Sequence, residues 1–403
     1  MADSTRRGQK HKKSNTMPNI SERGQLMPES PIRKLAPLAT AAKERGIHVY
    51  HLNIGQPDLP TPQVALDALK NIDRTVLEYS PSQGIRSYRE KLAQYYKRFE
   101  ILVDPDDIIV TCGGSEAVLF AFLSCLNPGD EIIIPNPSYN IYSTIPLIAG
   151  ATVKTYELLE ENNFQIDLEQ MKSLITDKTK MIVLLTPNNP LGSILEKDNL
   201  EGLAEILKDT DIIVLCDEVY ERLTYGEPAV SFGSLPGMKE RTITMNGFSK
   251  AFSMTGWRLG YFAAPKEMVD VMNVLSFYMT ACGVTFTQDA AVVALEEEDG
   301  SLEKMRSEFE KRRNYIVAEI NKTKHFSALM PKGAFYVFMN IKKTGMTSGE
   351  FTDYMLDNYR CSFIPGDVFG SAGEGFVRLS YASSMENLER LVVALNDLDA
   401  KLG

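Results

Sequence analysis

The 403-residue sequence predicts an α/β fold in which helices cover a buried, mainly parallel sheet. Two observations support this fold class. From residue 110 to residue 264, short β-rich runs alternate with amphipathic segments. The runs are mostly apolar at successive positions, as expected of strands covered on both faces, and they lie at 108–111, 131–134, 181–185, 212–216 and 242–245.

Apolar residues recur at helical spacing between these runs, at 117–124 and 200–207. The last third of the chain has a different pattern, with a charged helical segment at 302–320, a strand at 333–339 and a final helix whose apolar residues at 388–398 share one face. This pattern indicates a smaller α+β region beside the sheet. The chain is long enough for two or three domains.

The composition excludes two classes of partner. Lysine and arginine total 43 and aspartate and glutamate 53, so the formal net charge is -10. An acidic protein repels nucleic-acid phosphates and anionic membrane surfaces, so we expect neither as a partner. No apolar run approaches the ~20 residues of a membrane helix. An anionic cofactor would therefore need a local cluster of positive charge.

The five cysteines are scattered and odd in number, which favours reduced thiols in a cytoplasmic protein. Only four histidines occur, and the one close pair, His48 and His51, has no third ligand nearby in sequence, so we expect no metal site. Residues 1–16 are basic without a following apolar stretch and are not a secretory signal. We expect them to be a disordered tail or a remnant foreign to the natural chain.

Four segments lie where an α/β sheet places function, in the turns after strand ends. In the first, Gly113, Gly114 and Ser115 close a strand and open a helix, whose free amides can bind an anion. An ordinary helix start explains this pattern equally well. In the second, Asn189 lies in the turn 187–192 and could direct its amide at a bound ring. An ordinary Asn-Pro turn is the alternative there.

The third segment, 217–220, places the Asp217 carboxylate at the end of a buried strand, where it needs a partner to stay ionised. A capping aspartate explains this pattern equally well. In the fourth segment, 246–260, Lys250 follows a buried strand in a loop of small residues, and Arg258 comes eight residues later. Desolvation and a nearby cation lower a lysine pKa and give the free amine that imine chemistry requires. The local pattern disfavours the alternative of a surface lysine.

These segments resemble the class I/II aminotransferases of the aspartate aminotransferase superfamily, fold type I. The specific motif is Ser-Lys-Ala-Phe-Ser-Met-Thr-Gly-Trp-Arg-Leu-Gly-Tyr at 249–261, preceded at family-like spacing by Asn-Asn-Pro-x-Gly and Asp-Glu-x-Tyr. The resemblance covers residues 53–381 and is strongest to bacterial and archaeal aspartate-aminotransferase-like enzymes. It implies a large domain, 55–299, with a mostly parallel seven-stranded sheet, and a small α+β domain from both termini, 17–54 and 300–403.

The resemblance also implies pyridoxal 5'-phosphate (PLP) as cofactor. Lys250 would hold it through a Schiff base and then shuttle the substrate proton. Asp217 would pair with the pyridinium nitrogen, which keeps the ring an electron sink. Tyr220 and Asn189 would hydrogen-bond the ring's phenolic oxygen, and Tyr139 would stack on the ring. The phosphate would be held by Gly114, Ser115, Ser249 and Arg258, and by Tyr79 of the neighbouring subunit in a homodimer.

Substrate binding follows from the same resemblance. Arg378 resembles the arginine that clamps the substrate α-carboxylate, for which a bidentate fork suits better than lysine. Gly55 would lie beside the substrate. The implied reaction is a ping-pong transfer of an amino group between an α-amino acid and an α-keto acid, of aspartate/glutamate type. Two departures stand out: Gly247 replaces a serine common three residues before the lysine, and Ser115 replaces the lysine of some aspartate-specific relatives.

Other functions remain compatible with the pattern. The same lysine chemistry serves carbon–sulfur lyases, racemases and cyclopropane-forming synthases, of which a lyase is the main alternative. A regulatory domain fused to a DNA-binding module would need a winged-helix segment, and only about fifty residues precede Gly55. The segments 21–37, 78–86 and 276–285 are candidates for the side-chain pocket, but they do not indicate a preference between acidic, aromatic and small amino acids.

Overall fold

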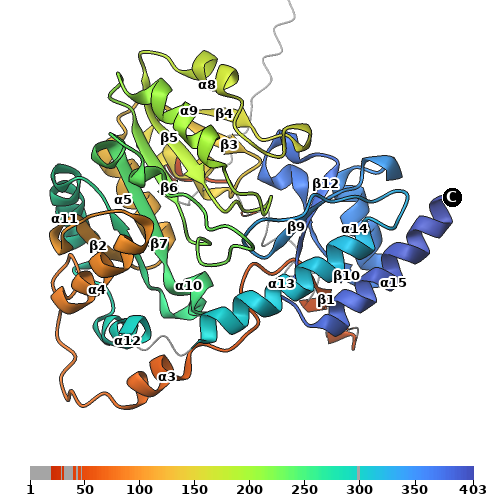
Figure 1. The fold of residues 1–403 in the computed structure, drawn as a ribbon, viewed down its shortest axis with the longest axis horizontal. Coiled ribbons are helices and arrows are strands. Elements are labelled where there is room, and N and C mark those ends of the chain that lie inside the picture. Colours follow the sequence, from red (N-terminus) through yellow and green to blue (C-terminus); the bar gives the residue numbers. More distant parts are fainter. Residues whose placement is uncertain (1–19, 29, 31–39, 42–43, 47, 297–299) are drawn as a thin grey trace, which may run out of the picture.

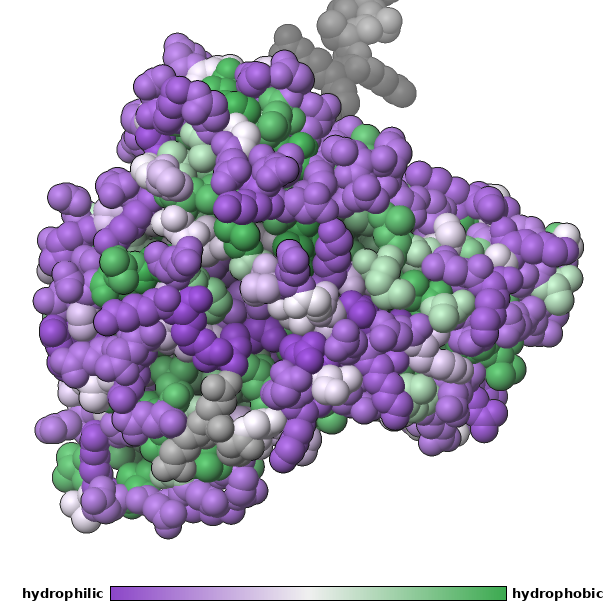
Figure 2. All heavy atoms as spheres, viewed as in Figure 1, coloured by the Kyte–Doolittle hydropathy of each residue, from purple (hydrophilic) through white to green (hydrophobic). Residues whose placement is uncertain are grey.

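The computed structural model describes residues 20–28, 30, 40–41, 44–46, 48–296 and 300–403. The predicted tail 1–16 lies outside the described residues. The molecule has a large layered part around one sheet and a second, smaller part formed mainly by the C-terminal third (Figure 1). No helix among the described residues has the length and apolarity to span a membrane. Hydrophilic side chains cover most of the face seen in Figure 2, with hydrophobic residues scattered among them.

The central sheet has seven strands in the order β2-β8-β7-β6-β5-β3-β4. β8 runs antiparallel to β2 and β7, and the other neighbours are parallel. The predicted α/β fold with a mostly parallel sheet is thereby confirmed. The strands are β2 (Ile108–Thr111), β3 (Glu131–Asn136), β4 (Thr152–Glu157), β5 (Thr179–Leu185), β6 (Ile213–Asp217), β7 (Thr242–Gly247) and β8 (Gly260–Ala263).

Helices cover both faces of this sheet, because successive strand residues point to opposite sides. On one face, β5 residues Ile182 and Leu184 pack with helices α8 (Leu168–Leu174) and α9 (Lys197–Leu207). On the other face, Met181 and Val183 pack with α5 (Gly114–Cys125) and α11 (Lys266–Thr280). The shorter or peripheral helices are α1 (Glu22–Gln25), α3 (Gln63–Lys70), α4 (Arg86–Tyr96), α6 (Ile141–Thr144), α7 (Pro146–Ala149), α10 (Phe248–Ala251) and α12 (Thr285–Glu296).

The smaller part contains a three-stranded antiparallel sheet in the order β11-β12-β9. A parallel pair of β1 (Tyr50–His51) and β10 (Cys361–Ser362) joins the N-terminal segment to the C-terminal third. Figure 1 shows this part beside the sheet, with α13 extending from one to the other. The remaining elements are α13 (Ser301–Ile320), β9 (Tyr336–Asn340), α14 (Ser348–Tyr359), β11 (Ile364–Pro365), β12 (Phe376–Ser380) and α15 (Met385–Leu402).

Two details differ from the sequence prediction. The strand expected at 333–339 begins only at Tyr336, because Ala334 adopts φ +57°, outside the extended region. The sheet also contains two strands that the apolar runs did not indicate. β4 is an edge strand with a largely solvent-accessible surface, and β8 overlaps the end of the lysine motif, so neither appears as an isolated apolar run.

Candidate active site

A cleft of about 540 Å³ opens at the carboxyl ends of β5, β6 and β7. This is the edge at which parallel α/β sheets bind ligands. Residues from the turns after these strands meet there with residues of β9 and β12 from the smaller part. Of the residues predicted to form the site, all but Tyr79 line this cleft, namely Gly55, Gly114, Ser115, Tyr139, Asn189, Asp217, Tyr220, Ser249, Lys250, Arg258 and Arg378.

Lys250 lies on the single turn of helix α10, directly after β7. Its Nζ donates a hydrogen bond to the Gly55 carbonyl oxygen at 2.5 Å. Burial, together with the positive charges of Arg378 and Arg258, lowers the pKa of Lys250 to about 8, and the charge of Asp217 acts in the opposite direction. A lowered pKa makes the free amine, the form that attacks a carbonyl carbon, accessible near neutral pH.

Asp217 is the last residue of β6 and is buried. Its Oδ1 accepts the backbone N–H of Val219 at 3.1 Å, and its Oδ2 accepts the hydroxyl of Tyr142. Burial raises the pKa of Asp217 to about 6, although both hydrogen bonds and the charge of Lys250 favour the ionised form. A buried carboxylate held in this way is suited to pair with a protonated ring nitrogen.

Arg258 and the start of helix α5 form a local positive region in the cleft. The arginine adopts φ +56° and its Nη1 donates to the Thr255 carbonyl at 2.9 Å. Gly113 precedes the helix with φ +80°, and a Cβ atom there would lie 2.2 Å from Nη2 of Arg258. The glycine therefore lets the guanidinium lie against the helix start, where free backbone amides add further positive potential. This donor set fits a phosphate group.

Gly247, where the family resemblance leads one to expect a serine, lies close to the neighbouring strand. It pairs with Gly260 across β7 and β8, and a Cβ atom at position 247 would lie 3.0 Å from the Leu259 carbonyl oxygen. The close approach of the two strands leaves little room for a side chain. The serine and threonine hydroxyl groups that line the cleft come from Ser115, Ser249 and Thr255.

Arg378 lies on β12 with only 2% of its surface exposed. Its Nη1 donates to Asn189 Oδ1 at 2.9 Å and its Nη2 to the Asn53 carbonyl at 2.7 Å, while its buried Nε has no partner. The guanidinium carbon lies 4.4 Å from the ring centre of Tyr336. No carboxylate among the described residues forms an ion pair with Arg378. A buried cation in this state fits a ligand carboxylate.

Two further tyrosines, which the sequence did not single out, line the cleft. Tyr142 is fully buried beside Asp217, and the hydroxyl of Tyr336 lies 2.8 Å from that of Tyr220. Tyr142 lies on α6, three residues after the predicted ring-stacking residue Tyr139, and no local motif marked it. Nothing local distinguished Tyr336 from the other aromatic residues of its strand.

Tyr79 is separate from the cleft of its own chain and is 84% exposed. Val76 and Leu77 next to it are also exposed. Of the other segments considered for the side-chain pocket, residues 29 and 31–37 lie outside the described residues. None of residues 276–285 lines the cleft within a single chain.

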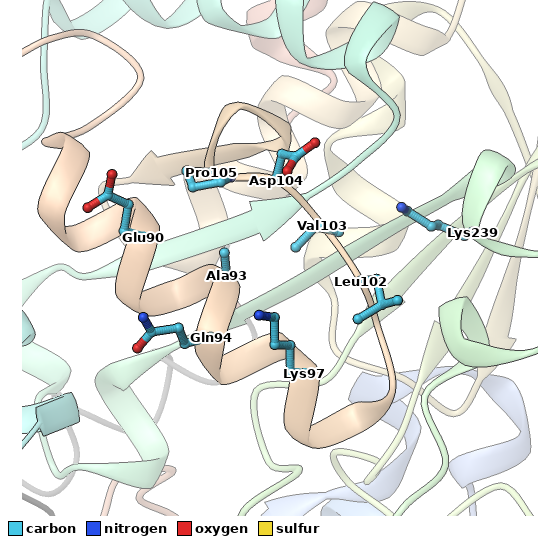
Figure 3. Close-up of a pocket in the computed structure, with 9 residues that line it drawn as sticks. All are labelled: Glu90, Ala93, Gln94, Lys97, Leu102, Val103, Asp104, Pro105 and Lys239. Atoms are coloured by element: carbon cyan, nitrogen blue, oxygen red, sulfur yellow. The ribbon is translucent and has the colours of Figure 1, made fainter.

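A second cavity of about 530 Å³ lies at α4 and the segment 102–105 (Figure 3). Lys97 and Lys239 line it from separate parts of the chain. It shares no lining residue with the Lys250 cleft. The two cavities are therefore lined by separate sets of residues.

The family model described as aminotransferase class I and II matches residues 47–395. The chain belongs to the class I and II aminotransferases. This aminotransferase is 40% identical to the aspartate aminotransferase of Pyrococcus abyssi and to the aromatic-amino-acid aminotransferase 2 of Thermococcus litoralis, with 92% of this chain and 95% of each relative covered. Its structure matches the aspartate aminotransferase of Thermus thermophilus with maleate at a TM-score of 0.90 and 33% identity, covering 95% of this chain and 100% of that one.

The aminotransferase is therefore a PLP-dependent enzyme of fold type I, which transfers an amino group between an α-amino acid and an α-keto acid. The cleft fits this cofactor on its own chemistry. The lysine of lowered pKa suits an amine-reactive aldehyde, and the buried carboxylate suits a ring nitrogen. The cationic helix start suits a phosphate.

Proposed function

We propose that the enzyme takes aspartate or glutamate as amino donor and returns the amino group to 2-oxoglutarate or oxaloacetate, in two half-reactions of ping-pong type. The likeness to the aspartate aminotransferase of Pyrococcus abyssi supports this substrate class. The equally similar aromatic-amino-acid enzyme of Thermococcus litoralis makes aromatic donors the necessary comparison. Ser115 occupies the cleft position at which some aspartate-specific relatives have a lysine, and this is a second reason to compare aromatic donors.

In the proposed site, Lys250 binds the cofactor and then carries the proton of the substrate α-carbon. Bound PLP supplies the electron sink that makes this proton removable. Asp217 holds the ring nitrogen protonated, Tyr220 and Asn189 hydrogen-bond the ring oxygen, and Tyr139 stacks on the ring. Gly114, Ser115, Ser249 and Arg258 bind the phosphate. The lowered pKa of Lys250, about 8, supports its role because the amine must lose a proton before it can act as a base.

Arg378 is proposed to bind the α-carboxylate of the substrate, which would place the α-carbon beside Gly55 and near Lys250. The contact of Lys250 Nζ with the Gly55 carbonyl oxygen supports this arrangement, because the two groups already lie on one wall of the cleft. The hydrogen bond from Arg378 to Asn189 joins the carboxylate site to the ring-oxygen site. We assign Arg378 to a small domain of residues 17–54 and 300–403 that moves over the large domain, 55–299, and excludes water.

We also propose a homodimer in which Tyr79 reaches the phosphate site of the neighbouring subunit. The exposure of Tyr79 and its absence from the cleft of its own chain support this. An exposed apolar surface on α11 and the segment before Tyr79 supplies an area for a second copy to cover. Its members are Val76, Leu77, Val271, Val274, Phe277 and Tyr278. We further propose a cytoplasmic location, which the five free cysteines support.

The single observation that supports the reaction best is the convergence of Lys250, Asp217 and Arg378 in one cleft. The test is the absorbance spectrum of the PLP-loaded enzyme with aspartate, glutamate or phenylalanine as donor. Loss of the visible band with a dicarboxylic donor, and its return with 2-oxoglutarate, is the expected result. A band that responds only to phenylalanine would show that the donors are aromatic amino acids and not aspartate or glutamate. Ammonia and a keto acid without any amino acid product would indicate lyase chemistry instead.

A further inference from the structure

We propose that Tyr336 is a positioning residue that directs the hydroxyl of Tyr220 toward the cofactor ring oxygen and makes it responsive to the charge of Arg378. This inference rests on the proposed roles of Tyr220 and Arg378. Tyr336 is 1% exposed and lines the cleft. A Cβ atom at Gly55 would lie 2.9 Å from its hydroxyl, so this oxygen is at the substrate wall.

The two hydroxyl groups lie 2.8 Å apart, and each carries one proton. Only one of the two protons can lie between the oxygens. When Tyr220 donates into the cleft, its oxygen is free to accept from Tyr336, and this arrangement orders both protons. Among the described residues, Tyr336 is the only hydrogen-bond partner of the Tyr220 side chain. Without it, the direction of the Tyr220 proton would be unspecified.

Arg378 contacts the aromatic ring of Tyr336. Its guanidinium carbon lies 4.4 Å from the Tyr336 ring centre. Burial raises the pKa of Tyr336, and the charge of Arg378 opposes that effect, which makes the phenol a stronger hydrogen-bond donor than burial alone would allow. A substrate carboxylate that pairs with Arg378 would weaken this influence. Binding of a substrate carboxylate to Arg378 would thus affect the Tyr220 hydroxyl through Tyr336.

The contact also connects the two parts of the molecule. Tyr336 begins β9 in the smaller part, and Tyr220 follows β6 of the large sheet. The hydrogen bond between Arg378 and Asn189 connects the same two parts. Both residues proposed to bind the ring oxygen are therefore tied to the smaller part by a separate hydrogen bond. A change in the position of the smaller part would therefore alter the orientation of both Tyr220 and Asn189 at the ring oxygen.

The test is the pH dependence of the visible absorbance of the PLP-loaded enzyme, which reports the proton shared between the Lys250 nitrogen and the ring oxygen. A hydrogen bond from Tyr220 favours the ionised ring oxygen, so weakening it shifts the midpoint to higher pH. For Tyr336→Phe we expect an upward shift of about half a unit to one unit, the size of one ordinary hydrogen bond. In Tyr220→Phe, adding Tyr336→Phe should produce no further shift.

Tyr381→Phe is the matched control. Tyr381 is fully buried, and its hydroxyl lies 3.3 Å from that of Tyr225 and 3.0 Å from the Ala334 carbonyl oxygen, outside the cleft. This variant should keep the wild-type midpoint. An unchanged midpoint in Tyr336→Phe, or an equal shift with and without Tyr220, would overturn the inference. A wild-type protein without any visible band after PLP addition would instead refute the proposed function.

Discussion

The hydroxyl group of Tyr142 donates a hydrogen bond to Oδ2 of Asp217 at the buried end of β6. The second carboxylate oxygen accepts the backbone N–H of Val219, so both oxygens have a donor. These donors favour the ionised carboxylate, whereas burial favours the protonated form and raises its pKa to about 6. Tyr142 therefore helps to keep Asp217 negative at neutral pH.

Removing this hydroxyl tests its contribution to cofactor binding. In Tyr142→Phe, the pKa of Asp217 should rise above its present value, and the carboxylate should pair less well with a ring nitrogen. We expect the affinity for PLP to fall about tenfold at pH 7, the effect of losing one hydrogen bond to a charged group. Fluorescence titration of the cofactor-free protein measures it. Tyr156→Phe, which removes the hydroxyl bonded to the Val183 carbonyl, should leave the affinity unchanged.

Gly113 provides a test of the phosphate site. In Gly113→Ala, the new Cβ atom would displace the Arg258 guanidinium and the backbone would keep a positive φ. PLP affinity should fall at least about tenfold, because a charged phosphate ligand is moved. Gly129→Ala is the control, since Gly129 has φ +91° and open space around it. It should lose about 1 kcal/mol of stability from backbone strain and no cofactor affinity.

Arg378→Lys tests the carboxylate site. A lysine retains the charge but cannot form two parallel hydrogen bonds, so kcat/KM for aspartate should fall about thirtyfold or more. Steady-state kinetics with varied donor concentration measures the change. Arg313→Lys changes another buried arginine, which lies over the Tyr225 ring and does not line the cleft. If both variants lose the same activity, the effect at Arg378 is one of folding and not of substrate binding.

The lowered pKa of Lys250 predicts a dependence of stability on pH. Its folded-state pKa of about 8 lies below the ordinary 10.5, so the protonated amine destabilises the cofactor-free fold. This effect is full below pH 8 and disappears as pH rises through 10.5. Cofactor-free Lys250→Met should therefore be more stable than wild type at pH 7, on the order of 2 kcal/mol. Urea denaturation should show the difference shrinking toward pH 10.5, and a constant difference would contradict the assignment.

The sequence predicted the elements that are continuous and apolar. Strands β5 and β6 are buried on both faces and appear as uninterrupted apolar runs. β4 was missed because it is a partly exposed edge strand, and β8 because its first residues are the end of the lysine motif. Their place in the sheet depends on pairing with distant strands, which no local pattern contains.

The cleft residues also divide into those that the sequence could predict and those that it could not. Lys250 and Asp217 belong to motifs, and each lies at or just after the end of a buried strand, so their meeting at one sheet edge could be predicted. Tyr142 and Tyr336 form hydrogen bonds with partners 75 and 116 residues away in sequence, Asp217 and Tyr220. Such contacts are set by tertiary packing alone. The role of Tyr79 depends on a second chain and stays a prediction.

The central claim is that Lys250 binds PLP and releases it to the substrate. Borohydride reduction of the PLP-loaded enzyme, followed by digestion and mass spectrometry, tests this most directly. We predict a pyridoxyl group on Lys250, absent when aspartate or glutamate is added before reduction and restored by 2-oxoglutarate. A pyridoxyl group on another lysine, or none in an enzyme that transfers amino groups, would contradict the account.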